Sequence, residues 1–147
     1  MAPITSALVE VGAIRDFADI LTGAAKSWVR ALFPNSTDAM LEDLSVCIKE
    51  AFNNAADHAY KTMPSGVGVV KMLLQYVPER KSVEVTLRDT GKGIYNIEQA
   101  LEAGFTTGSA KHSGMGFSII KHFSDDFEVI SKLNRGTVVK IVKVVQE

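Results

Sequence analysis

Three short segments, each polar or rich in glycine, restrict the fold of this chain more than any other feature. Residues 50–58 read EAFNNAADH, residues 89–93 read DTGKG, and residues 114–117 read GMGF. The first lies within a helical pattern of apolar residues, the second ends an alternating strand pattern, and the third opens another helical pattern. A fold that uses them together must bring a helix face, the end of a strand and a helix N-terminus to one place.

Length and composition favour a single domain over residues 1–147. A chain of 147 residues, 46% of them hydrophobic, can form one compact core and is too short for two. Its 16 basic and 17 acidic side chains nearly cancel and form no long run of one sign. Charge therefore predicts neither a nucleic-acid partner nor a membrane partner, and it agrees with an ordinary solvated surface.

The single cysteine, Cys47, excludes a disulfide within the chain and is typical of a reducing compartment. The N-terminal residues lack the basic and long apolar segments of a secretion signal, and no stretch approaches about 18 uncharged apolar residues. We therefore expect a cytoplasmic protein.

Apolar periodicity predicts the first half of the chain to be mainly helical. A weak strand pattern over residues 4–11 precedes a helix that begins near Asp16, a candidate N-cap, and stops at Pro34. The polar turn at residues 35–38 then opens a second helix, whose apolar stripe continues to Ala59.

The second half alternates between strand and helix patterns. We expect a hairpin of two strands at residues 69–76 and 83–88, a short helix at 97–103, a mobile loop at 104–113 and a helix at 114–123. Two closing strands follow at residues 127–131 and 137–145. This order predicts an α+β fold: a two-layer sandwich with a mixed, mainly antiparallel sheet of about five strands and helices on one face.

The second predicted helix carries four polar residues that share one quadrant if the helix is regular: Glu50, Asn54, Asp57 and His58. A carboxylate at this position can act as a base. An asparagine carbonyl one turn away can be a protein ligand of a hydrated Mg²⁺ that also binds triphosphate oxygens. The alternative is the ordinary polar flank of a packed helix.

Asp89 ends a predicted strand and is followed by Gly91 and Gly93. A carboxylate here can accept a hydrogen bond from an exocyclic amine, and two glycines permit the close approach of a flat ring, which suits adenine. A plain turn after a strand has the same pattern.

Gly114, Met115 and Gly116 open a predicted helix whose backbone N–H groups are suited to phosphate. A helix that merely starts with glycines is the alternative, and the segment lacks the Gly-Lys-Ser/Thr of a Walker loop. The three histidines, His58, His112 and His122, have no zinc-ligand spacing, and no nucleophile elbow is present.

Taken together, these segments resemble the GHKL superfamily of ATP-binding domains, and within it the anti-sigma F serine kinase group. Residues 50–60 resemble the N box of the family, residues 88–94 the first glycine box, and residues 105–107 with 113–117 the lid and second glycine box. The Asp125-Asp126 and Gly136-Thr137 pairs also match, and the likeness extends from about residue 38 to residue 142.

The resemblance implies ATP and Mg²⁺ as cofactors and assigns roles by position. Glu50 would be the catalytic base, Asn54 the Mg²⁺ ligand and Asp89 the acceptor for the adenine amine. The other residues implied at the nucleotide are Asp57, His58, Gly91, Gly93, Thr106, Thr107, Lys111, His112, Gly114, Met115, Gly116 and Thr137. One departure concerns His112, which stands where the group has arginine, beside Lys111 and in a shorter lid. A cationic contact to the terminal phosphate would then come from Lys111 or from charged His112.

The favoured function is a protein serine/threonine kinase that also acts as an anti-sigma factor. It would sequester a sigma factor and phosphorylate an anti-anti-sigma protein, and the likeness suggests a homodimer. Two alternatives remain open: a nucleotide-gated module that binds a partner without phosphotransfer, and a detached ATP-binding domain of a histidine kinase.

Overall fold

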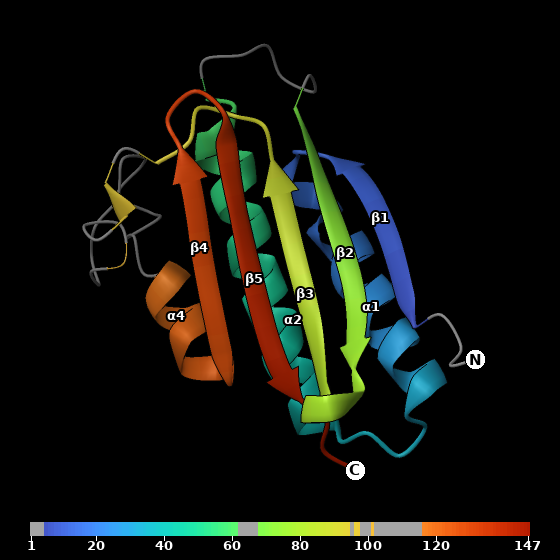
Figure 1. Ribbon diagram of the computed structural model, residues 1–147. Helices are drawn as coiled ribbons and strands as arrows, with labels where there is room; N and C mark the ends of the chain where they lie inside the picture. The colour runs from blue at the N-terminus through green and yellow to red at the C-terminus, as the bar shows by residue number, and fades with distance from the viewer. Residues whose placement is uncertain (1–4, 62–67, 95, 98–100, 102–115) are drawn as a thin grey trace.

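The computed structural model describes residues 5–61, 68–94, 96–97, 101 and 116–147. In this part of the chain, a five-stranded sheet has the order β1-β2-β3-β5-β4. The strands are β1 (Ser6–Gly12), β2 (Val69–Val77), β3 (Ser82–Asp89), β4 (Asp126–Lys132) and β5 (Gly136–Val144). Helices α1 (Ala18–Leu32), α2 (Asp38–Asn54) and α4 (Gly116–Phe123) cover one face of this sheet (Figure 1).

This arrangement confirms the predicted α+β two-layer sandwich. We expected a mixed, mainly antiparallel sheet, but all four strand pairings of the described sheet are antiparallel. Hairpins join β2 to β3 and β4 to β5, and helices α1 and α2 lie between β1 and β2 in the chain. Strands β3 and β4 run in the same direction, but β5 lies between them in the sheet. No described strand therefore needs a parallel neighbour.

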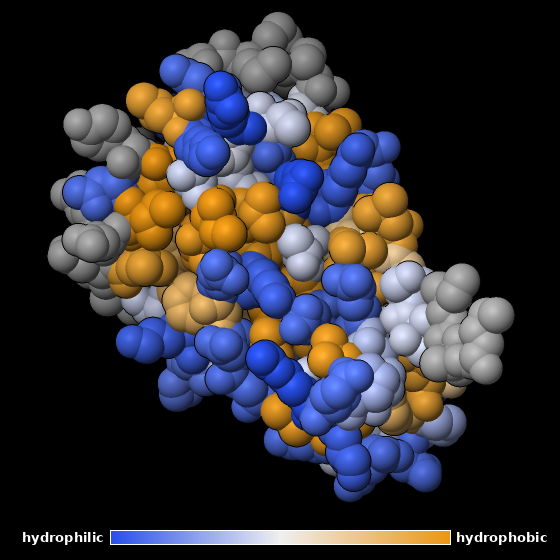
Figure 2. All heavy atoms as spheres, viewed as in Figure 1, coloured by the Kyte–Doolittle hydropathy of each residue, from blue (hydrophilic) through white to orange (hydrophobic). Residues whose placement is uncertain are grey.

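Strand alternation separates a core face from an open face. The inward residues of β2, β3 and β5 form the core with the helices: Val70, Met72, Leu74, Val83, Val85, Leu87, Val139 and Ile141. The open face mixes charged residues with exposed apolar ones such as Leu8 and Ile130. Figure 2 shows this side of the molecule as orange areas among blue ones.

The N-termini of the two long helices differ in how they are capped. Thr37 caps α2, because its hydroxyl accepts a 3.2 Å hydrogen bond from the amide of Met40. The expectation for Asp16 is wrong: Arg15–Phe17 form a 3-10 turn, and Phe17 takes the N-cap position of α1 without a side-chain hydrogen bond.

Helix α2 does not continue as an α-helix to Ala59. Residues Ala55–Ala59 form a π-helix, whose hydrogen bonds reach one residue further than those of an α-helix. Each residue then advances by less than 100° around the axis. The prediction that four residues share one quadrant assumed a regular α-helix. It therefore applies to Glu50 and Asn54 but cannot be extended to Asp57 and His58.

The two predicted hairpins are present. Pro78–Arg80 and Lys81 join β2 to β3, and Lys81 adopts φ 46°. Asn134 (φ 62°) and Gly136 (φ 119°) turn β4 into β5. Of the predicted helix at 97–103, only the 2.9 Å bond from the Leu101 amide to the Ile97 carbonyl is described, and the predicted loop at 104–113 lies outside the described residues. No helix in the described ranges is both long and apolar enough to cross a bilayer.

Candidate functional site

The side chain of Asn54 lies directly against Gly116, at the first described residue of α4. A Cβ atom placed on Gly116 would be 3.0 Å from Asn54 Nδ2 and 3.1 Å from Asn54 Oδ1. The structure therefore brings the polar face of α2 against the first described residue of α4. Glycine leaves the space that the amide occupies, and a larger residue would push the amide away.

Helix α4 is held in this position by packing along α2. Phe117 and Ile120 are buried, and the Cys47 thiol lies 3.8 Å from the Ile120 carbonyl. Burial raises the pKa of Cys47 to about 12, so the thiol is neutral at physiological pH and contributes packing.

Asp89 is a buried carboxylate at the end of β3. Its Oδ1 accepts hydrogen bonds from the amides of Gly91 (3.0 Å) and Thr137 (3.3 Å). Burial raises the pKa of Asp89, and these two amides oppose the shift. No residue in the described part of the chain donates to Oδ2, so this oxygen can accept a hydrogen bond from a ligand amine.

Ser131 connects Asp89 and Thr137 to the turn after β3. The Ser131 Oγ accepts a 2.7 Å hydrogen bond from the Ile94 amide and lies 2.7 Å from Thr137 Oγ1 and 3.1 Å from the Gly136 carbonyl. Sequence reasoning missed Ser131. The available signal was a hydroxyl in the inward series of β4, after Phe127 and Val129.

The glycines after Asp89 are required by protein packing. A Cβ on Gly91 would be 2.2 Å from the Ala59 carbonyl oxygen, and one on Gly93 (φ +74°) would be 2.2 Å from the Lys132 carbonyl oxygen. The Lys92 amide also donates a 2.7 Å hydrogen bond to Ala59 O. The turn thus fits tightly against the π-helix and the β4–β5 turn, which explains both glycines without reference to a ring.

Tyr60 is a second residue that sequence reasoning missed. Its hydroxyl donates to the Val69 carbonyl (2.7 Å) and accepts from the Thr90 amide (2.8 Å). A Cβ on Gly68 would fall 2.2 Å from the Tyr60 ring. Tyr60 therefore ties the end of the π-helix to the start of β2 and the end of β3.

Glu50 and Asp57 lie near a cation that the sequence did not predict. Arg15 binds Asp57 through two hydrogen bonds, Nε to Oδ1 at 2.8 Å and Nη2 to Oδ2 at 3.0 Å. This hydrogen bonding raises the pKa of Arg15, with a smaller contribution from the charge of Glu50. Both Asp57 oxygens thus bond to Arg15, while Glu50 and His58 are half-buried. The 42-residue separation left no local signal for Arg15.

Six predicted site residues fall outside the described ranges: Thr106, Thr107, Lys111, His112, Gly114 and Met115. On the phosphate side, the described structure therefore places Gly116 and Asn54 only. The same ranges hold no group of three or more His, Cys, Asp or Glu residues that could bind a metal ion. A divalent cation at Asn54 would need further oxygens from its ligand, as Mg²⁺ bound to a triphosphate has.

A family model described as the histidine kinase-like ATPase domain matches residues 15–143 of this chain. The chain belongs to this ATPase family. The matched range contains Asn54, Asp89, Gly116 and Thr137, and the family implies ATP binding.

Among curated proteins, the chain is similar to anti-sigma F factors. It is 38% identical over 117 residues to the anti-sigma F factor of Anoxybacillus flavithermus, covering 77% of each chain. The corresponding protein of Heyndrickxia coagulans is 36% identical over 117 residues, covering 77% of this chain and 78% of the relative. The chain is thus an anti-sigma F factor-like member of the ATPase family.

Solved structures of low sequence identity share the fold. The RsbU and RsbW domains of Rv1364c from Mycobacterium tuberculosis superpose with a TM-score of 0.64 at 15% identity, covering 98% of this chain and 32% of that one. A mycobacterial sensor histidine kinase, MprB, gives a TM-score of 0.57 at 18% identity, covering 95% and 99%. These matches support the two-layer architecture.

Proposed function

We propose that this ATPase-family domain is an ATP-dependent protein serine/threonine kinase that acts as an anti-sigma factor. It would sequester a sigma factor and phosphorylate an anti-anti-sigma protein. The observation that carries the proposal is the contact of Asn54 with Gly116 in a chain 38% identical to an anti-sigma F factor. The nucleotide site would lie at that contact and extend to Asp89.

The adenine would bind at the Asp89 end of the site. The two amides that bond Oδ1 fix the orientation of the carboxylate, which leaves Oδ2 to accept a hydrogen bond from the exocyclic amine. Thr137 would back the ring, with its hydroxyl oriented by Ser131. Gly91 and Gly93 keep the turn close enough for this pocket to form.

The phosphates would bind where α4 begins. The N-terminal amides of α4, with Gly114 and Met115 before Gly116, would bind phosphate oxygens through the helix terminus. The Asn54 carbonyl would hold Mg²⁺, which when bound neutralises charge on the triphosphate oxygens. Thr106, Thr107, Lys111 and His112 would close over the terminal phosphate, and His58 would border the site from the π-helix.

Glu50 would be the base for transfer. Its carboxylate would take the proton from a seryl or threonyl hydroxyl of the partner as that oxygen bonds to the γ-phosphorus. The bond between the γ-phosphorus and the oxygen that bridges it to the β-phosphate breaks, and ADP leaves with the electron pair of that bond. Arg15, bound to Asp57, would keep positive charge near Glu50.

The test is incubation of the purified protein with labelled ATP, Mg²⁺ and a candidate anti-anti-sigma protein. We expect label on a partner serine or threonine, stable to acid, and lost in Glu50→Gln while ATP affinity is retained. Acid-labile label on a partner histidine would instead support the histidine-kinase alternative. Tight ATP binding without any transfer would support the nucleotide-gated module.

Sigma-factor binding needs its own experiment. Pull-down of a candidate sigma factor in the presence of ATP, and again with ADP, should show retention that depends on the nucleotide. If the sigma factor is retained equally with ATP, with ADP and without nucleotide, binding does not depend on the nucleotide and this part of the proposal is wrong.

A further inference from the structure

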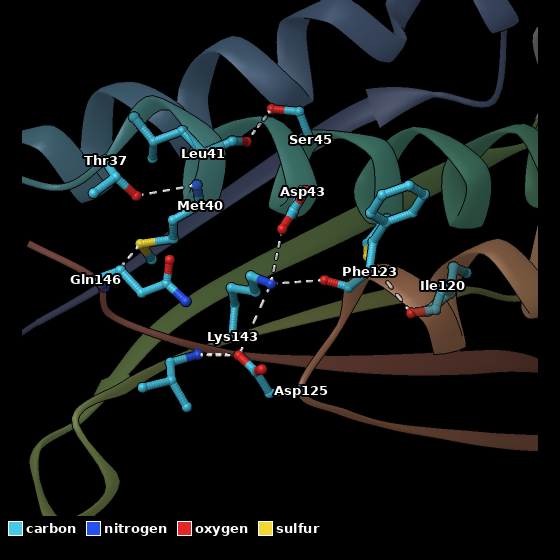
Figure 3. A network of polar contacts seen from close by, with 12 residues as sticks. Thr37, Met40, Leu41, Asp43, Ser45, Ile120, Phe123, Asp125, Lys143 and Gln146 are labelled. Carbon is cyan, nitrogen blue, oxygen red and sulfur yellow. Dashed lines mark hydrogen bonds and ion pairs between the residues drawn. The ribbon is translucent and has the colours of Figure 1, made fainter.

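Lys143 is a charged side chain in a position where the strand pattern calls for an apolar one. On β5 it follows Val139 and Ile141 in the inward series, and its side chain is only 7% exposed. A buried ammonium is costly unless acceptors surround it. Figure 3 shows that its side chain points between α2 and α4.

Helices α2 and α4 and the bend after α4 supply acceptors for this ammonium. Lys143 Nζ donates a 2.8 Å hydrogen bond to the Phe123 carbonyl and pairs with Asp43 Oδ2 at 3.1 Å and with Asp125 Oδ2 at 4.0 Å (Figure 3). Asp125 is fixed in turn by a 2.7 Å hydrogen bond from the Val144 amide. We call Lys143, Asp43, Asp125 and the Phe123 carbonyl the lysine clamp.

The lysine clamp acts on the C-terminus of α4. Phe123 is the last residue of that helix, and its carbonyl is one of the four that a helix leaves without an internal partner. A cation at this end also interacts favourably with the helix dipole. The clamp thus fixes the end of α4 with a directional bond, whereas apolar packing alone would restrain sliding along the axis less.

The other end of the same helix reaches the proposed phosphate site. Helices α2 and α4 run antiparallel, because Asp43 lies near Phe123 through Lys143, Cys47 lies near Ile120, and Asn54 lies against Gly116. The eight residues of α4 span only about 12 Å. A displacement at Phe123 is therefore carried to Gly116 along a short, stiff helix.

We propose that Lys143 is a positioning residue for nucleotide phosphate binding: it sets the axial position of α4 and so the distance between the α4 N-terminus and Asn54. This inference rests on the proposed nucleotide site. It assigns no contact between Lys143 and the ligand.

The test compares affinities for ATP and for adenosine in Lys143→Met. Adenosine uses only the Asp89 end of the site, so it reports on the pocket that α4 does not form. We expect ATP affinity to fall about tenfold, within the range for substitutions that act on a ligand without touching it, while adenosine affinity stays within about twofold. Isothermal titration for ATP and NMR titration for adenosine give the two values.

Lys140→Met is the matched control. Lys140 lies on the same strand but on the open face, where its ammonium is 3.5 Å from Glu84. The same substitution there should leave both affinities unchanged. If Lys143→Met lowers both affinities equally, or neither, the positioning role is wrong and Lys143 only stabilises the fold.

A second variant covers the case in which Lys143→Met does not fold. The double substitution Asp43→Asn with Asp125→Asn weakens the lysine clamp at side chains that are 37% and 40% exposed, so no buried charge loses all its acceptors. We expect about a threefold loss of ATP affinity with adenosine affinity unchanged. Unchanged ATP affinity would overturn the inference. A wild type that binds ATP but phosphorylates no partner would refute the kinase proposal and leave this affinity comparison valid.

Discussion

Asp89 and Thr137 face each other across β3 and β5, and the Thr137 amide donates a 3.3 Å hydrogen bond to Asp89 Oδ1. With the Gly91 amide on the same oxygen, the carboxylate has one fixed orientation in a site where it is only 8% exposed. A buried carboxylate with one oxygen committed to the backbone is a directional acceptor. This geometry makes Asp89 the residue where the proposed adenine contact can be tested most sharply.

We predict that Asp89→Asn lowers ATP affinity by at least about tenfold, because two hydrogen-bond donors that face each other in a buried site cost on the order of 1–3 kcal/mol. The two backbone amides require an oxygen at the Oδ1 position, so the new amide must place its NH₂ group where Oδ2 stood. That group would face the adenine amine as a second donor. Isothermal titration measures the effect, and unchanged affinity would remove Asp89 from the site.

We also predict that Asp89 makes stability depend on pH. Because burial raises its pKa in the folded state above 3.8, the folded state binds the proton more tightly than the unfolded state does. The stability that comes from this protonation is complete below pH 3.8 and is lost as the pH rises through the folded pKa. Asp89→Asn does not titrate, so its stability relative to wild type should be greatest at neutral pH.

Urea unfolding of both proteins without nucleotide, from neutral pH down toward pH 4, measures this difference. The advantage of Asp89→Asn should shrink as the pH falls. A difference that is constant with pH, or that grows in acid, would show that the carboxylate is not disfavoured in the folded state.

The long elements were predictable because their periodic patterns depend on local geometry. The helix stripe of α2 and the alternation of β2 and β3 need no knowledge of distant residues. Two errors were local departures from regular geometry: the 3-10 turn that displaces Asp16 and the π-helix that rotates Asp57. Neither departure changes the apolar spacing from which the helices were predicted.

The missed site residues share a different cause. Arg15, Tyr60 and Ser131 act through partners 42, 30 and 37 residues away, so their local sequence resembles any polar surface. Lys143 was missed because a lysine in a strand is ordinarily read as solvent-facing. The glycines at 91 and 93 were found, but the reason for them is backbone packing, which only the folded chain reveals.

We predict that Ser131→Ala loosens the turn after β3. The Ile94 amide loses its 2.7 Å acceptor and the Thr137 hydroxyl loses its neighbour, so the free energy of unfolding should fall by about 1–2 kcal/mol. Adenosine affinity should fall with it, because the turn borders the Asp89 pocket. Ser6→Ala, at an exposed position of β1, should change stability by less than about 0.5 kcal/mol. Equal effects of the two substitutions would show that the Ser131 bonds contribute nothing specific.

We predict that Gly116→Ala separates stability from ATP binding. Alanine favours a helix over glycine by about 0.5–1 kcal/mol, but its Cβ would lie 3.0 Å from Asn54 Nδ2, so the amide must shift by a few tenths of an ångström. Stability should therefore change little or rise, whereas ATP affinity in the presence of Mg²⁺ should fall several-fold.

Gly23→Ala provides the control for this experiment. Gly23 lies within α1, and nothing approaches within 4 Å of a Cβ built there, so alanine should raise stability by about 0.5–1 kcal/mol and leave ATP affinity unchanged. Thermal unfolding and titration with Mg²⁺ and ATP measure both variants. If Gly116→Ala binds ATP as wild type does, the contact between Asn54 and Gly116 has no part in nucleotide binding, and the observation that carries the proposed function loses its meaning.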